Sequence, residues 1–145
     1  MLALALTLML GCDGGNTSVG GDDGTADDTG DTGPVEDVTC PTITHTPLPD
    51  GQPLGVPVDI TATVTDDISG VFVVKLYFKQ ETSSTWSDLA MSLSGTDSYA
   101  AQIPASAVGS GGMHYYIQAV DLDQNSCTLP VDGADDPNHF RVDGG

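Results

Sequence analysis

Basic residues are almost absent from this chain. Its 145 residues include three Lys and Arg against 21 Asp and Glu, a formal net charge of −18, and the first basic residue is Lys75. A surface so uniformly negative repels phosphate backbones, which excludes nucleic acid as a partner, and it is not held by charge on anionic lipids. The excess of acid favours solubility and cation binding instead.

Long apolar runs are also missing. The longest is MLALALTLML at the start, and it ends at Gly11 and Cys12 with acidic residues directly behind it. Crossing a membrane takes about 20 apolar residues, so we do not expect this segment to span one. The run resembles a bacterial lipoprotein signal, with Met9, Leu10 and Gly11 before the lipid-accepting Cys12. The resemblance implies that residues 1–11 are a signal segment, and that lipid on Cys12 anchors the mature chain to the membrane at the bacterial cell envelope, at the outer membrane or cell surface.

The composition changes after Cys12. Residues 13–39 hold eight acidic side chains, no basic ones and few sizeable apolar groups. Such a segment cannot bury enough surface to offset the entropy of ordering it. We therefore expect residues 12–39 to be a disordered acidic tether rich in Gly, Asp and Thr. The spacing of its Asp residues is too irregular to favour calcium-binding repeats.

The remaining residues, 40–145, alternate apolar and polar side chains with a period of two, as half-buried antiparallel strands do. In 71–79, for example, the alternation places Phe72, Val74, Leu76 and Phe78 on one face. Further strands are predicted at 58–65, 86–93, 98–103 and 113–121. Residues 127–131 and 139–142 are predicted to supply the last strand, which a GADDPN excursion interrupts. No helical period is evident. About seven short strands in this length predict an all-β, two-sheet antiparallel sandwich.

Several segments carry a family resemblance: PTITHTPL, VPVDITATVTDDISGV, LYFK, YAAQIPA and MHYYIQAVD. They resemble a bacterial fibronectin type III or immunoglobulin-like domain over residues 41 to about 142. The resemblance implies that Tyr115 makes the tyrosine corner of the family. It also implies use as a spacer, an adhesive module or the partner of a separate catalytic domain.

This interpretation assigns a role to each of the three cysteines. Export implies an oxidising compartment, and if Cys12 is acylated then Cys40 and Cys127 remain as a pair. The implied topology places both at the pole where strands A and G begin, so we expect a disulfide between them. The alternative is two separate thiols.

The same topology gathers acidic turn residues at that pole, and oxygen ligands of this kind suit Ca²⁺. Asn125 offers a neutral oxygen. The alternative is solvated turn residues that satisfy nearby backbone donors. The predicted calcium ligands are Asp66, Asp67, Asp97, Asp121 and Asp123.

Aromatic residues suggest a different binding surface. Tyr77, Trp86 and Tyr116 are candidates for an outward-facing group on one sheet, where they would contact a carbohydrate or protein ligand. The alternative is that Trp86 caps the core.

Signatures of catalysis are lacking. His45, His114 and His139 fall on different predicted strands without paired spacing, so we expect surface or edge-strand histidines and no zinc centre. Ser110, in VGSGG, lacks the strand-to-helix context of a nucleophile elbow. We expect no enzyme and no cofactor other than calcium.

These observations predict a non-catalytic cell-envelope lipoprotein that presents an immunoglobulin-like binding or spacer domain. Its partners would be the membrane, through the lipid on Cys12, and a protein or carbohydrate ligand at the cell surface. Two alternatives stay open: an accessory domain of a larger secreted hydrolase that is truncated in this sequence, and a calcium-dependent adhesive module.

Overall fold

A computed structural model describes residues 33–144. The predicted signal segment at 1–11, the lipidation of Cys12 and most of the tether lie outside the described residues. Within them, no helix is long and apolar enough to cross a membrane. A compact unit runs from Pro34 to Gly145. It therefore starts before the predicted boundary at Cys40, because Asp37 is buried against two loops of the domain.

One sheet contains four strands in the order β1 (Thr42–Thr44), β3 (Val58–Thr65), β7 (Ser98–Ile103) and β6 (Ser92–Leu93). All neighbours are antiparallel. Alternate residues of β3 are buried, with Val58, Ile60, Ala62 and Val64 facing the core and polar residues facing solvent. The predicted alternation is confirmed for this strand.

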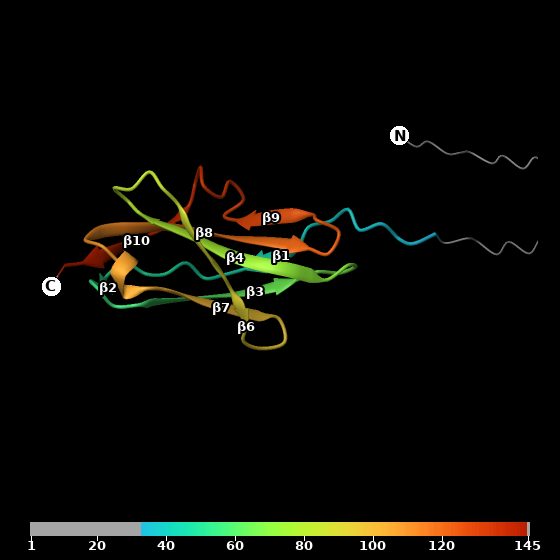
Figure 1. Cartoon of the computed structure of the whole chain (residues 1–145), viewed down its shortest axis with the longest axis horizontal. Coiled ribbons are helices and arrows are strands. Elements are labelled where there is room, and N and C mark those ends of the chain that lie inside the picture. Colours follow the sequence, from blue (N-terminus) through green and yellow to red (C-terminus); the bar gives the residue numbers. More distant parts are fainter. Residues whose placement is uncertain (1–32, 145) are drawn as a thin grey trace, which may run out of the picture. The chain divides into compact units, whose positions relative to one another are not determined.

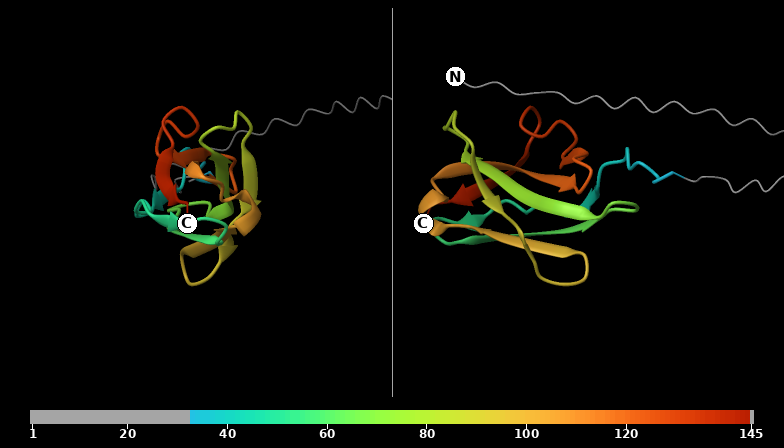
Figure 2. Two further views of the ribbon diagram at one scale, coloured as in Figure 1. Left: turned by 90° about the vertical axis from the view of Figure 1, so that its left-hand side faces the viewer. Right: turned by 45° about the vertical axis from the view of Figure 1, so that its right-hand side comes forward.

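The second sheet has the order β2 (Gln52–Pro53), β10 (Asn138–Asp143), β8 (Gly111–Asp121), β4 (Val71–Gln80) and β5 (Ser87–Ala90). A further strand, β9 (Ser126–Leu129), also pairs with β8. Only β2 and β10 are parallel among these pairs. In Figure 1, β3, β7 and β6 lie below β4, β8 and β9, and Figure 2 gives the end-on and oblique views of the two layers.

The core lies between the two sheets and takes large side chains from both. Ile60 and Ile103 come from the first sheet, and Leu76, Tyr115 and Phe140 from the second. The described residues contain no α-helix, and η1 (Ala105–Ala107) is a single 3₁₀ turn. The prediction of an all-β, two-sheet architecture is confirmed.

Two large apolar residues in the predicted strands face solvent. Phe72 is 61% exposed, because the register of β4 against β8 shifts between Val71 and Val73 and turns the intervening residue outward. Leu93 is 60% exposed, since β6 is a two-residue edge strand and its alternation from Met91 does not continue into the core. The strand was assigned correctly around Phe72 and its face was wrong. The predicted strand at 86–93 was wrong as a unit, because it divides at Met91 into β5 in the second sheet and β6 in the first.

The disulfide between Cys40 and Cys127 is present, with the two Cα atoms 5.6 Å apart. It joins Cys40, two residues before β1, to Cys127 in β9, across 87 residues of sequence. The predicted pairing is confirmed. The bond attaches the start of the domain to the second sheet at the pole where the chain enters.

Tyr115 is fully buried, as its predicted role requires, but its hydrogen bonds differ from those of a tyrosine corner. Its hydroxyl accepts from the backbone N–H of Leu48 at 3.1 Å and lies 2.9 Å from Nε2 of His45. A tyrosine corner bonds to backbone a few residues upstream. Here both partners lie in the connection between β1 and β2, so Tyr115 attaches this connection to β8.

Candidate functional site

Three carboxylates meet at the pole where the chain enters. They belong to Asp37, which precedes β1, Asp66, which follows β3, and Asp121, the last residue of β8. One oxygen from each lies within 4.8 Å of the others. Asp37 and Asp121 are buried and Asp66 is partly buried. We call these three residues the acidic triad.

Hydrogen bonds stabilise the ionised form of Asp37. Its Oδ2 accepts from Ser69 N at 3.0 Å, and its Oδ1 accepts from Thr39 N at 3.0 Å and Thr39 Oγ1 at 2.9 Å. Hydrogen bonds from Ser69 and then Thr39 lower the pKa of Asp37 from 3.8 to about 2. Asp37 is therefore a carboxylate at neutral pH. It was not among the predicted ligands, because residues 12–39 have the composition of one solvated segment.

The other two members differ in how their oxygens are satisfied. Asp121 accepts from Asn125 N and Asn125 Nδ2, both at 2.8 Å. Asp66 uses only one oxygen: its Oδ2 accepts from Gly70 N at 2.6 Å and from Ile68 N at 3.3 Å. Its Oδ1 is buried and has no hydrogen-bond partner. An unpaired carboxylate oxygen beside two further carboxylates can accept a cation.

The predicted calcium ligands are thus only partly brought together. Asp66 and Asp121 belong to the triad, while Asp67 accepts from Thr39 Oγ1 at 3.1 Å and Asp123 accepts from Asp37 N at 3.3 Å. Asp97 lies at the same end of β3, where its carbonyl accepts from Val64 N, but it is not a member. Asn125 presents its amide nitrogen, which donates to Asp121 and to the carbonyl of Asp37. The expectation of an oxygen ligand from Asn125 is corrected by this orientation.

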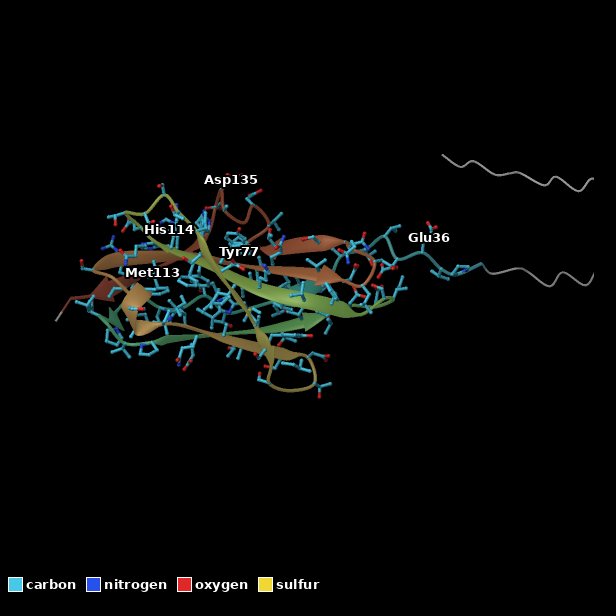
Figure 3. The ribbon with its side chains drawn as sticks, viewed as in Figure 1. Glu36, Tyr77, Met113, His114 and Asp135 are labelled. Atoms are coloured by element: carbon cyan, nitrogen blue, oxygen red, sulfur yellow. A yellow bond between two sulfur atoms is a disulfide. The ribbon has the colours of Figure 1, made fainter. Side chains whose placement is uncertain are left out.

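The predicted aromatic residues lie together on the outer face of the second sheet. Tyr77 of β4 and Tyr116 of β8 are opposite in register, and their rings stack with centroids 4.7 Å apart and 5° between planes. Trp86 lies almost perpendicular to Tyr116, with centroids 5.0 Å apart. Figure 3 labels Tyr77 at β4. We call these three residues the aromatic group.

The geometry of the aromatic group limits what it can bind. The two tyrosine rings cover one face of each other, and Lys79 Nζ lies 4.9 Å from the centre of the Trp86 ring. Burial, and then the charges of Tyr77 and Asp88, raise the pKa of Tyr116. The group therefore presents ring edges, a hydroxyl and a cation to a ligand. It is not an open, coplanar platform for a sugar ring.

The histidines are arranged in a way that the spacing in the sequence did not indicate. His45 is half-buried and hydrogen-bonded to Tyr115, so it is an interior connection between the sheets. His114 and His139 are opposite each other in the β8 and β10 register, with ring centroids 5.1 Å apart. Only the strand pairing brings them together, because 24 residues separate them in the chain.

No protein-family model and no curated protein matches this chain. Among solved structures, the chain is similar to part of a β-glucosidase from Listeria innocua in complex with gluconolactone, with a TM-score of 0.43 and 16% identity. The match covers 72% of this chain, which spans 16% of the length of that one. A likeness at this level carries no argument about function.

Proposed function

We propose that this chain is a non-catalytic lipoprotein of the bacterial cell envelope, in which one immunoglobulin-like domain serves as a binding or spacer module at the end of an acidic tether. The observation that carries the proposal is the way the tether meets the domain. The disulfide at Cys40 and the buried Asp37 fix the incoming chain to one pole. The last strand, β10, ends at the opposite pole (Figure 1).

This arrangement suits a module that is displayed away from an anchor. Because the chain enters at one end of the sandwich and leaves β10 at the other, the long faces of both sheets are available to partners. The order of strands supports the finer fold assignment. β1, β3 and β7 correspond to strands A, B and E, and β4, β8 and β10 to strands C, F and G of the immunoglobulin fold.

The aromatic group is the surface through which we propose binding. Tyr, Trp and a basic residue are enriched where proteins bind proteins, since they combine apolar area with a polar end. Tyr77, Trp86 and Tyr116 are partly exposed and adjacent to Lys79, one of the few cations of the chain. The edge-on arrangement of the rings favours a protein ligand with an acidic group over a carbohydrate.

The anchor is tested by the intact mass of the mature protein from membranes, measured with and without reductant. The proposal expects loss of residues 1–11, a lipid adduct at Cys12, and a gain of two hydrogens when the disulfide is reduced. Cys12→Ser should give an unprocessed chain without lipid that partitions into the aqueous phase of a detergent extraction. A wild-type chain that keeps residues 1–11 and carries no lipid would overturn the envelope assignment.

Binding is tested by cross-linking at the cell surface with a photoreactive group placed at exposed Ser87, beside Trp86. We expect adducts that disappear in the Trp86→Ala variant and persist in Asp135→Asn, whose side chain is exposed on the connection between β9 and β10. A spacer without a ligand on this face would give no specific adduct. That result would leave the spacer role and remove the binding role.

A second function, that of a calcium-dependent adhesive module, is favoured by Oδ1 of Asp66, which is buried without a hydrogen-bond partner. Ca²⁺ would take oxygens from the acidic triad and complete its shell with water, which relieves the mutual repulsion of the three carboxylates. A ligand that binds only the folded state raises the melting temperature. We expect Ca²⁺ to do so for the wild type and for Asp135→Asn, and not for Asp66→Asn. An intact chain that melts at the same temperature with Ca²⁺ and with chelator has no such site.

A further inference from the structure

A second group of possible metal ligands lies on the outer face of the second sheet and differs from the acidic triad in its chemistry. It consists of Glu81, His114 and His139, and one ligand atom from each lies within 4.8 Å of the others. The antiparallel register sets His139 of β10 directly opposite His114 of β8. Their neighbours Met113 and Phe140 are buried in the core, so both imidazoles project from the outer side. Figure 3 labels His114 and Met113 on opposite sides of β8.

Glu81 approaches the two histidines from the third strand of this face. It is the first residue after β4, and its backbone N–H donates to the carbonyl of Gly112 at 2.9 Å, which extends the β4–β8 pairing by one step. Its Oε2 lies 4.0 Å from His139 Nε2. The three donors therefore come from β10, from β8 and from the first residue after β4, and the pairing of these adjacent segments fixes the positions of their backbones.

Gly112 keeps the space between the donors open. A Cβ at this position would lie 2.7 Å from His139 Nε2 and 3.1 Å from Glu81 Oε2. Unlike its neighbour Gly111, whose φ is +112°, Gly112 has a backbone conformation that other residues adopt freely. The backbone conformation at position 112 therefore does not require glycine. The contacts that it avoids are with the two ligand atoms and with the backbone carbonyl oxygen of Phe140, which would lie 3.1 Å from the Cβ.

Burial of the ring, and then the charges of His139 and of Lys79, which lies opposite His114 in the β4–β8 register, lower the pKa of His114 below its ordinary value of 6.5. Lys79 Nζ lies 4.9 Å from the Trp86 ring centre, where a cation–π interaction with the ring stabilises its charge.

We propose that Glu81, His114 and His139 form a site for a divalent transition-metal ion of the zinc class. Two imidazole nitrogens and one carboxylate suit Zn²⁺, Ni²⁺ or Cu²⁺ and not Ca²⁺, which prefers oxygen alone. Ligands at about 2.1 Å from Zn²⁺ in a tetrahedron lie roughly 3.4 Å apart. The donor atoms, now within 4.8 Å of one another, therefore have to move slightly closer, and the Glu81 side chain, 54% exposed, is free to rotate inward. A fourth position stays open to solvent.

The site is tested by calorimetric titration of the whole chain with zinc sulfate. The chain carries Cys12→Ser, so that a free thiol does not bind the ion. We expect one ion per chain at this site. Because even the loss of an outer partner of a ligand costs about tenfold or more in affinity, His114→Gln and His139→Gln should each weaken binding at least about tenfold.

Two further variants distinguish zinc bound at Glu81, His114 and His139 from zinc bound at the acidic triad or elsewhere on the chain. Asp66→Asn removes a member of the acidic triad and should leave zinc binding unchanged. Gly112→Ala keeps all three ligands but fills the space between them, and should weaken binding as the histidine variants do. The side chain of His139 is 34% exposed, so its variant remains folded even if Gly112→Ala does not. The proposal is overturned if the chain takes up no zinc, if both histidine variants bind it undiminished, or if Asp66→Asn abolishes binding.

Discussion

The hydroxyl of Tyr115 and Nε2 of His45 lie 2.9 Å apart and join the two sheets through a chain of hydrogen bonds. Nδ1 of His45 lies 2.6 Å from the carbonyl oxygen of Thr61, which can only accept, so Nδ1 carries the proton. Nε2 is then the acceptor for the Tyr115 hydroxyl, which in turn accepts from Leu48 N–H. Every polar atom of this connection has a partner.

Tyr115→Phe should destabilise the domain by about 1–3 kcal/mol, because it leaves His45 Nε2 and the Leu48 N–H without partners. Urea denaturation measures the difference. Tyr77→Phe is the matched control: its hydroxyl bonds Gln118 Oε1 at 3.2 Å on the outer face, where water replaces the lost bond. Equal losses from the two variants would contradict the role of the interior connection.

The same connection predicts a difference at alkaline pH. Burial raises the pKa of Tyr115 above its ordinary value of 10.0. A folded-state pKa above the unfolded value means that the contribution is complete below pH 10.0 and is lost as pH rises through the folded-state pKa. The wild type should therefore lose more stability than Tyr115→Phe on alkaline titration. Parallel loss in both proteins would assign the alkaline transition to other groups.

Reduction of the Cys40–Cys127 disulfide should cost about 4 kcal/mol, since the bond closes a loop of 87 residues in the unfolded chain. Reductant is expected to lower the urea midpoint of the wild type. The Cys40→Ser, Cys127→Ser double variant should unfold at the lower midpoint with or without reductant. A wild-type midpoint that reductant leaves unchanged would show that the bond contributes nothing to stability.

Alternation within each strand predicted most of the strands, because the period of two depends only on which side chains are near in sequence. It did not predict β2, which has two residues, and it joined β5 and β6 into one strand. What it could not predict was pairing between strands. The outward turn of Phe72 depends on a register shift against β8. The meeting of His114 with His139 depends on the register of β8 and β10. Both are decided by partners remote in the chain.

The acidic pole was predicted in part for a related reason. Asp66 follows a predicted strand and Asp121 ends one, and the resemblance to a known fold placed both strand ends at the same pole. Asp37 lies in a segment whose average composition resembles a solvated tether. Its burial depends on single hydrogen bonds from Ser69 and Asn125 to its side chain and carbonyl. Composition averaged over a segment does not report such bonds.

Phe72 offers a direct test of the register shift between β4 and β8. If its side chain faces solvent, Phe72→Thr should change stability by no more than about 0.5 kcal/mol, as surface substitutions do. Leu76, on the same strand and fully buried, is the comparison: Leu76→Ala should cost about 2–5 kcal/mol through the cavity that it leaves. A Phe72→Thr variant as unstable as Leu76→Ala would restore the regular alternation predicted for residues 71–79.

Asp37 makes the stability of the entry pole depend on acid pH. Hydrogen bonds from Ser69 and Thr39 lower its pKa from 3.8 to about 2, so the carboxylate is favoured more in the folded state than in the unfolded one. Its contribution is therefore complete above pH 3.8 and is lost as pH falls from 3.8 toward 2. Stability measured by urea denaturation across this window, in chelator so that bound cations do not contribute, should fall more steeply for the wild type than for Asp37→Asn. Asp135→Asn, at an exposed position, should follow the wild-type slope. If Asp37→Asn also follows that slope, the bonds from Ser69 and Thr39 do not favour the ionised carboxylate, and the chain before Cys40 is not held at the pole by it.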